Sequence, residues 1–547
     1  MNGTKRLPFE LQAQAAGSAA RACRFETLHG PVQTPLFMPV GTQATVKAQW
    51  PQDLQRAGSQ VLLANTYHLL LRPGTAVFEA MGGIHRFMRW DKPVLTDSGG
   101  YQIFSLPKSR RISEEGALFS SYVNGEPILL SPERSIAVQR SIGSDIMMVL
   151  DECVPSDAPF AEVKRAVELT QRWAARSLTA RADSPQALFA IVQGALFLEL
   201  RKRSAAGLLE LPFDGYALGG LAVGESKAQR EDTCEYAAGL LPEDRPRYLM
   251  GVGTPLDVLE AVHRGIDMMD CVIPTKVASR GLAYSWQGTL EMRRGVYRVD
   301  PRPLDERCGC PACQGGFSRA YLHHLTKTQE VLGWQLIGLH NLWFYHDLMR
   351  QIRESVLRGD FAQCHRRWRE VLDAQDTDYP VRPPVRKRPL APTENGPWVL
   401  RQENGGLARI EHSQLGLCWS GQLDAAEAKE VAVWVGEVLA QCEALGPAQS
   451  HCVDAGELRL GLRGMALALA YKEALVQGRR LCALEIRSHR GDLRPMKLAL
   501  ANLRHFEGLR HGSLQALMKR GRWVSRRAPG LSWVLEGWPV AEEASQE

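Results

Sequence analysis

Three aspartates stand at the ends of apolar runs, where a carboxylate has few polar neighbours in the sequence. They are Asp97 in KPVLTDSGG, Asp151 in DIMMVLDEC and Asp270 in IDMMDCVIPT. A carboxylate in such surroundings loses hydration, so its pKa must rise unless a partner stabilises the charge. Two carboxylates in one pocket can divide the work of glycosyl transfer, since one can attack a sugar carbon while the other moves protons. We predict Asp270 as the nucleophile because its apolar flanks fix it in place; a helix N-cap or a turn is the alternative role for any one such aspartate.

The aspartates belong to a repeating pattern of apolar runs and helix-like stretches such as SPERSIAVQRSIG. The runs are QVLLANTYHL (60–69), KPVLTDSGG (92–100), DIMMVLDEC (145–153), ALFAIVQGA (187–195), YALGGLAVGE (216–225), RYLMGVGTP (247–255) and IDMMDCVIPT (266–275). Runs without polar alternation indicate a parallel sheet covered on both faces. We therefore predict an α/β fold containing a (β/α)8 TIM barrel, with a doubly wound open sheet as the alternative.

In a TIM barrel, side chains at the C-terminal ends of the strands share one site. The polar or glycine residues that end the runs are Asp97, Ser98, Asp151, Gln193, Gly220, Gly253 and Asp270. Several such residues ending parallel strands together favour an active site over a set of unrelated turns.

A second group of residues has the spacing of a metal site. Cys308, Cys310 and Cys313 form a C-x-C-x2-C motif, and His340 follows after 26 intervening residues. Three cysteines and one histidine form a closed structural zinc site, because four protein ligands leave no position for substrate. Buried cysteines without a metal are the alternative. The predicted zinc-binding subdomain is an insertion at about residues 300–375.

Composition limits the class of protein. The chain has 547 residues, of which 45% are hydrophobic and 23% charged, as in ordinary globular proteins. The N-terminus lacks the apolar core of a signal peptide, and no later run is long enough to span a membrane, so we expect a cytoplasmic protein with no membrane partner. A net charge of +6 permits a polyanionic partner without requiring one.

Several segments together resemble the signature motifs of bacterial tRNA-guanine transglycosylase. They are MPVGTQATVK (38–47), ANTYHLLLRPG (64–74), TDSGGYQ (96–102), SPERSI (131–136), DECV (151–154), VQG (192–194), GGLAVGE (219–225), YLMGVGTP (248–255) and MDCVIPT (269–275). The resemblance runs in order through about residues 8 to 375. It implies a zinc-bearing barrel that exchanges the guanine at the first anticodon position of certain tRNAs for a 7-deazaguanine base, a step of queuosine biosynthesis.

The resemblance gives the strand ends individual roles. Asp270 is expected to form a covalent intermediate with the target ribose, and Asp97 to act as general acid and base. The expected base-binding residues are Asp151, Gln193, the backbone of Gly220, the carbonyl of Leu221, and Tyr101 and Met250 on the two faces of the ring, with Ser98 beside them. A purine fits between an aromatic ring and a thioether.

The resemblance also bears on substrates and partners. Val223 and Cys153 match the bacterial form, which implies 7-aminomethyl-7-deazaguanine as the incoming base. Lys276 and Arg280 are expected to contact tRNA, although Ser279 stands where an arginine is typical of the family. A homodimer is also implied. Two other functions stay open: a related transglycosylase acting on DNA, and a tRNA-binding partner subunit without catalysis.

The chain continues well beyond the usual end of that family. We predict a barrel over residues 1–378, a proline- and arginine-rich linker over 379–397, and a smaller α/β domain over 398–547. This last part faintly resembles half of a SAM-dependent methyltransferase acting on wobble uridine in tRNA. Its glycine-rich turn would be Gly456, Gly461 and Gly464, and Glu485 would end the next strand.

The extension is too short for a complete methyltransferase domain, so we do not expect S-adenosylmethionine as a cofactor. Residues 479–527 contain thirteen Lys or Arg against three Asp or Glu. That excess favours a surface that binds RNA phosphates, and a solvated basic face is the alternative.

Overall fold

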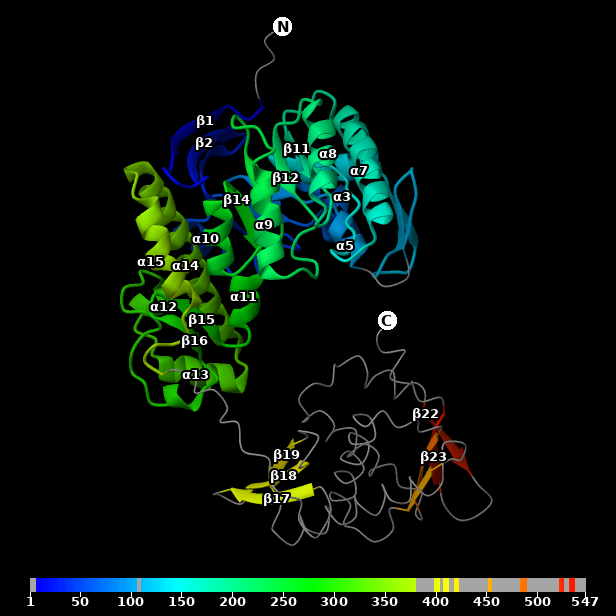
Figure 1. Cartoon of the computed structure of the whole chain (residues 1–547), viewed down its shortest axis with the longest axis vertical. Coiled ribbons are helices and arrows are strands. Elements are labelled where there is room, and N and C mark those ends of the chain that lie inside the picture. The colour runs from blue at the N-terminus through cyan, green and yellow to red at the C-terminus, as the bar shows by residue number, and fades with distance from the viewer. Residues whose placement is uncertain are drawn as a thin grey trace. The chain divides into compact units, whose positions relative to one another are not determined.

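The computed structural model describes residues 6–105 and 110–379, and beyond them only the backbone of seven strands. The chain divides into two compact units, Met1–Arg382 and Pro383–Glu547 (Figure 1). Among the described helices, none is both long and apolar enough to cross a membrane. The predicted linker lies almost wholly outside the described residues.

Eight parallel strands form the centre of the first unit. They are β4 (Leu36–Pro39), β5 (Leu62–Ala64), β6 (Val94–Thr96), β10 (Ile146–Met148), β11 (Ala187–Val192), β12 (Gly215–Leu218), β13 (Arg247–Leu249) and β14 (Met268–Cys271). Their order is β4-β14-β13-β12-β11-β10-β6-β5, and a parallel bridge between Val40 and Leu63 joins the two edges. The sheet therefore closes on itself, which confirms the barrel and excludes the open sheet.

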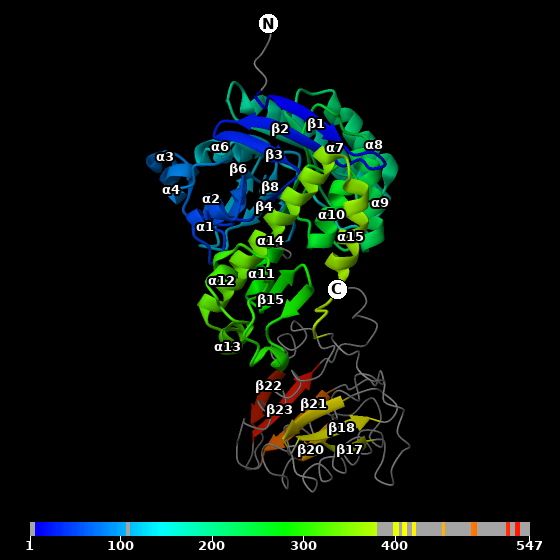
Figure 2. The same ribbon diagram turned by 90° about the vertical axis from the view of Figure 1, so that its left-hand side faces the viewer.

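Helices on the outside of the barrel cover these strands (Figures 1 and 2). They are α1 (Pro51–Arg56), α2 (Thr66–Leu71), α3 (Thr75–Met81), α4 (Ile84–Met88), α6 (Pro132–Ile142), α7 (Phe160–Arg181), α8 (Leu198–Leu209), α9 (Lys227–Ala238), α10 (Pro255–His263), α14 (Val331–Arg358) and α15 (Phe361–Asp373). The short helix α5 (Gly100–Phe104) follows β6 at the C-terminal end of that strand. The predicted start of α6 is confirmed, since the Ser131 hydroxyl accepts a hydrogen bond from the Arg134 amide.

Smaller elements lie at the two ends of the barrel unit. The antiparallel sheet of β1 (Phe9–Gln14), β2 (Arg21–Thr27) and β3 (Gly30–Thr34) lies at one end (Figure 2). A second antiparallel sheet follows α5 and contains β7 (Arg110–Ile112), β8 (Ala117–Ser120) and β9 (Pro127–Leu130). The sequence pattern did not indicate either sheet.

The other end of the unit has its own small core. This segment contains α11 (Ile273–Ala278), the hairpin of β15 (Leu282–Ser285) and β16 (Gly288–Glu291), the 3-10 helix η1 (Gly295–Tyr297), α12 (Pro311–Gln314) and α13 (Arg319–Thr328). Its buried side chains run from Ala278 to Ile337, whereas Phe361 and Trp368 of α15 belong to the barrel core. The first turns of α14 pack on this small core and the rest of α14 packs on the barrel, so α14 connects the two.

The second unit contains two sheets among its described residues. One has the antiparallel strands β17 (Trp398–Glu403), β18 (Leu407–His412) and β19 (Cys418–Gln422). The other has the order β20 (His451–Asp454), β21 (Ala483–Ser488), β23 (Leu531–Glu536), β22 (Gly521–Ser525).

The strand directions of this second sheet can be compared with the methyltransferase resemblance, which stays a prediction. β20 and β21 are parallel, but β23 runs antiparallel beside β21, which differs from the all-parallel half of a nucleotide-binding sheet. Glu485 is the third residue of β21 and not its last. The predicted glycine-rich turn lies outside the described residues.

Candidate active site

The C-terminal ends of the barrel strands surround a cavity of about 340 Å³. All nine predicted catalytic and base-binding residues line it: Asp97, Ser98, Tyr101, Asp151, Gln193, Gly220, Leu221, Met250 and Asp270. Cys153 and Val223 line it as well. The strand ends thus bring together residues that are up to 173 positions apart in the sequence.

Asp270 is held by hydrogen bonds to only one of its two carboxylate oxygens. The Tyr248 hydroxyl donates to Oδ1 at 2.5 Å, and the Gly251 amide donates to the same atom at 2.7 Å. Within the described residues Oδ2 has no hydrogen-bond partner. Burial raises the pKa of Asp270, and the two donors act against that rise. A fixed carboxylate with one unengaged oxygen at a cavity wall can act as a nucleophile.

Asp97 lies at the end of β6 in a more closed environment. The Asn65 side-chain amide donates to its Oδ2, and the Thr66 amide donates to Oδ1 at 2.8 Å. Burial raises the pKa of Asp97 to about 6, and the neighbouring charge of Asp270 contributes to the rise. A carboxyl group with such a pKa can both give and take a proton near neutral pH.

Asp151 follows β10, four strands from β14 and its Asp270, and forms the centre of a hydrogen-bonded group. The Ser98 hydroxyl donates to Oδ1 at 2.9 Å, and the Gln193 side-chain amide donates to Oδ2 at 2.7 Å. Burial raises the pKa of Asp151, and these two donors act against that rise. The carboxylate keeps free lone pairs that could accept hydrogen bonds from a ligand.

Only glycine fits at position 220, because any side chain there would be strained and would clash with Gln193. Its φ angle is +63°, and a Cβ atom there would lie 2.4 Å from the Oε1 atom of Gln193. The glycine therefore allows its backbone to approach the Gln193 side chain closely.

The loop after Gly220 is fixed by a glutamate that the sequence did not single out. The Glu225 carboxylate accepts hydrogen bonds from the amides of Ala222, at 2.5 Å, and Val223, at 3.0 Å. A trans peptide directs its C=O and N–H to opposite sides, so the Leu221 carbonyl points away from Glu225. Tyr101 has an exposed fraction of 51% at the same cavity, which leaves its ring available for stacking.

Lys276 and Arg280 do not line the cavity. Both are exposed on or just after α11, the helix that follows Asp270 in the chain. Ser279, between them, donates its hydroxyl to the carbonyl of Lys276 at 2.7 Å. The two cations thus stand at the surface next to the site, without a salt bridge to any described carboxylate.

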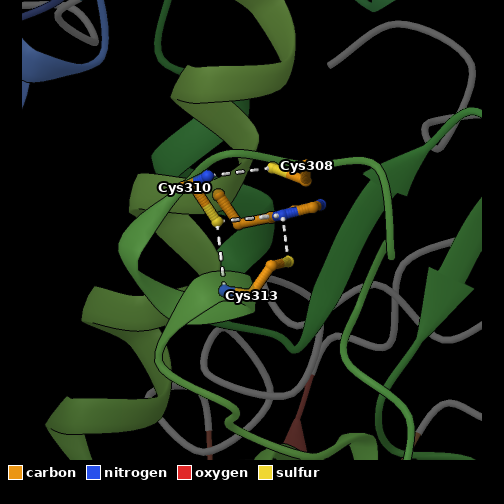
Figure 3. A group of neighbouring side chains, drawn as sticks. Cys308, Cys310 and Cys313 are labelled. Atoms are coloured by element: carbon orange, nitrogen blue, oxygen red, sulfur yellow. Dashed lines mark hydrogen bonds between the residues drawn. The ribbon is translucent and has the colours of Figure 1, made fainter.

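The predicted metal ligands come together beside α14. Figure 3 shows Cys308, Cys310 and Cys313 grouped around the same point, and His340 completes the group. The sulfur atoms of Cys310 and Cys313 lie 3.5 and 3.4 Å from His340 Nδ1. Ligands of one tetrahedral zinc ion would be about 3.6 Å apart, so the spacing suits a bound metal. The Nε2 atom of His340 donates to the Tyr284 carbonyl at 2.7 Å, which orients Nδ1 toward the sulfurs.

A second cluster of donor atoms contains His29, His85 and Asp145. His29 Nδ1 and His85 Nε2 bond to the two oxygens of Asp145 at 2.9 and 3.0 Å, and the imidazole rings stack with centroids 3.5 Å apart. Two imidazoles on one metal would keep their ring centres at least about 4.5 Å apart. This stacking excludes joint ligation in the observed arrangement, and the cluster fastens the β2–β3 turn to the start of β10.

Comparison with known proteins agrees with the resemblance of the sequence motifs. The sequence matches the family model described as "Queuine tRNA-ribosyltransferase" over residues 16–374. A queuine tRNA-ribosyltransferase from Thioalkalivibrio sulfidiphilus is 50% identical over 353 residues, which are 64% of this chain and 94% of that protein. The corresponding protein from Nitrosomonas eutropha is 51% identical over 344 residues, 63% of this chain and 95% of the relative. That of Pseudoalteromonas translucida is 50% identical over 375 residues, 68% of this chain and 99% of the relative.

Proposed function

Because the chain belongs to the queuine tRNA-ribosyltransferase family, we propose that it exchanges guanine at the first anticodon position of tRNA for a 7-deazaguanine base in queuosine biosynthesis. The observation that carries the proposal is the pair of carboxylates at one cavity: Asp270 with an unengaged oxygen, and Asp97 with a pKa raised to about 6. A nucleophile and a proton carrier are the two groups that this exchange requires.

The reaction proceeds through two displacements at the anomeric carbon of the ribose. Asp270 attacks this carbon, the bond to N9 of guanine breaks, and guanine leaves with a proton from Asp97. The incoming base then gives its N9 proton to Asp97 and attacks the same carbon, which releases Asp270. Two displacements retain the configuration of the sugar, as in other transfers with a covalent intermediate.

The wall opposite the nucleophile binds the base. Asp151 accepts hydrogen bonds from the N–H groups of the purine edge, while Gln193 and the Gly220 amide donate to the carbonyl oxygen. The Leu221 carbonyl accepts from the aminomethyl group of 7-aminomethyl-7-deazaguanine. Tyr101 and Met250 contact the faces of the ring.

Val223 excludes a bulkier base from the same cavity, since its branched side chain lines the wall. Queuine, which carries a cyclopentenediol, is therefore expected to be a poor substrate. Equal rates for queuine and 7-aminomethyl-7-deazaguanine would contradict this assignment.

Outside the cavity, the four-ligand group binds zinc and has a structural role. Lys276 and Arg280 contact the tRNA backbone near the target nucleotide, and the basic extension adds further phosphate contacts. The protein acts as a homodimer in the cytoplasm, where its tRNA substrate is found.

Labelled guanine tests the proposed function on two nucleic acids. Incorporation into tRNA but not into DNA of matched anticodon-loop sequence supports it. Incorporation into DNA would instead identify a related DNA transglycosylase, and incorporation into neither would identify a binding subunit without catalysis. The two carboxylates at the cavity argue against that last function.

A further inference from the structure

The guanidinium group of Arg201 lies fully buried behind the predicted base pocket. Arg201 is on α8, and its exposed fraction is 0%. No described carboxylate forms a salt bridge with it, and burial lowers its pKa to about 10. A buried cation without a carboxylate partner is costly unless its N–H groups are hydrogen-bonded.

All the hydrogen bonds of Arg201 go to backbone carbonyls at the ends of two neighbouring barrel strands. At the end of β11, Nη1 donates to Val192, the last residue of the strand, at 2.7 Å, and Nε donates to Ala195 at 2.9 Å. After β12, Nη1 also donates to Gly219 at 2.7 Å and Nη2 donates to Gly220 at 3.3 Å. One side chain thus ties together the two loops that carry Gln193 and Gly220.

These bonds determine where the Gly220 amide points. In a trans peptide the C=O and the following N–H point to opposite sides. Because the Gly219 carbonyl faces Arg201, the Gly220 N–H faces away from Arg201. Gly220 lines the cavity, and among the described residues its N–H has no hydrogen-bond partner. The N–H is therefore a free donor on the cavity side.

The same helix also fixes Gln193. The Ser204 hydroxyl of α8 accepts a hydrogen bond from the backbone amide of Gln193 at 3.1 Å. The carbonyls of Val192 and Ala195, which flank the Gln193–Gly194 segment, are both held by Arg201. Gln193 in turn contacts Asp151, so α8 supports the whole wall that would read the base edge.

We propose that Arg201 is a positioning residue, which aims the Gly220 N–H at the carbonyl oxygen of the base and so makes the site prefer guanine-type bases. This inference rests on the proposed function. Guanine presents that oxygen beside the N–H groups that Asp151 would accept. A purine such as 2-aminopurine has no oxygen there and gains nothing from the oriented amide.

Equilibrium binding of guanine and of 2-aminopurine to the full-length protein, without tRNA, tests this role. In Arg201→Met we expect guanine affinity to fall at least about tenfold and 2-aminopurine affinity to change less than about threefold. Arg201→Lys keeps the charge but has fewer hydrogen-bond donors, so it should lose part of the preference for guanine over 2-aminopurine. This variant replaces Arg201→Met in the test if Arg201→Met does not fold.

Arg247→Lys is the matched control. Arg247 begins β13 at the other end of the barrel, donates to the carbonyls of Leu241 and Pro242, and has a pKa also lowered to about 10 by burial. Its substitution should leave the preference for guanine unchanged. Equal weakening of both bases in the Arg201 variants, or an unchanged preference, would overturn the positioning role. A wild-type protein without any preference for guanine would overturn the proposed function as well.

Discussion

At the scale of single residues, the shared feature of the site is that its carboxylates are buried without cationic partners. Asp97, Asp151 and Asp270 all have raised pKa values, and burial is the largest cause in each case. Hydrogen bonds from hydroxyls and amides keep them in place without neutralising them. Such groups remain chemically available, whereas salt-bridged carboxylates do not.

The raised pKa of Asp97 predicts that this carboxyl group lowers the stability of the fold at neutral pH while it serves catalysis. In the folded protein the Asp97 carboxyl group keeps its proton up to a pH of about 6, whereas in the unfolded chain it loses the proton near pH 3.8. The free energy of unfolding therefore falls as the pH rises between these values. Asp97→Asn removes this loss. Its free energy of unfolding should exceed that of the wild type at pH 7, by up to about 3 kcal/mol, and match it near pH 4.

Exchange by the same variant should fall about 10²- to 10⁴-fold, because the amide cannot carry the proton. Denaturant unfolding across this pH range and labelled-guanine exchange check the two effects. A variant that is less stable than the wild type at pH 7 would contradict the account of Asp97.

Tyr248→Phe tests how Asp270 is held. Loss of the hydroxyl removes one of the two donors to Oδ1, so the pKa of Asp270 should rise further and the carboxylate should be held less firmly. We expect kcat/KM to fall about tenfold, and the acid limb of its pH profile to move to higher pH. The control is Tyr216→Phe in β12, which does not line the cavity. A pH-independent loss would show that Tyr248 acts only through packing.

The sequence identified the carboxylates but not their supports. Asp97, Asp151 and Asp270 stand out because each ends an apolar run, and their meeting follows from the barrel alone. Asn65, Tyr248, Glu225 and Arg201 act through contacts with neighbouring strands or loops, and spacing along the chain carries no signal of such contacts. Asn65, Tyr248 and Glu225 do lie within the segments that resemble the family, which could have marked them.

At the scale of elements, the apolar runs indicated the strands correctly but not their lengths. The run QVLLANTYHL contains only the three residues of β5, and its second half begins α2. The polar Asn65 between them turns the chain and contacts Asp97. Residues after a barrel strand line the site or begin the next helix, and many of them are also apolar. An apolar run can therefore continue past the end of its strand.

The metal group is predicted to hold an element together rather than to catalyse. Cys310→Ser should lower zinc content to below one ion per chain and release the segment around α12 and α13, since structural zinc can supply about 10 kcal/mol of folding free energy. Limited proteolysis and metal analysis check this. The control is Cys364→Ser, a buried thiol in α15 outside the group, which should keep its zinc. Freshly purified, active wild-type protein without zinc would contradict the structural role.

At the scale of the whole molecule, the chain combines a complete family barrel with an additional unit. The family match ends at residue 374, and the first compact unit ends at Arg382. The barrel strands, the cavity and the metal ligands all lie before that point. The extension is therefore predicted to affect tRNA binding and not the chemical steps.

Truncation between residues 383 and 395 tests this division. The shortened protein should fold and should exchange guanine at saturating tRNA with a kcat close to that of the full chain. Its tRNA affinity should be lower and less dependent on salt, because each lost phosphate contact reduces the slope of log affinity against log salt by about 0.7 to 0.9. Identical slopes for both proteins would reject RNA binding by the extension, and S-adenosylmethionine binding by the full chain alone would favour a methyltransferase.

The most direct test of the whole account is to trap the covalent intermediate. Wild-type protein mixed with tRNA and denatured without incoming base should yield a protein–tRNA adduct, and mass spectrometry should place the ribose on Asp270. Asp270→Asn should fold, retain zinc and give no adduct, because an amide is a poor nucleophile toward a sugar carbon. An adduct on another residue, or undiminished guanine exchange by pure Asp270→Asn, would contradict the account.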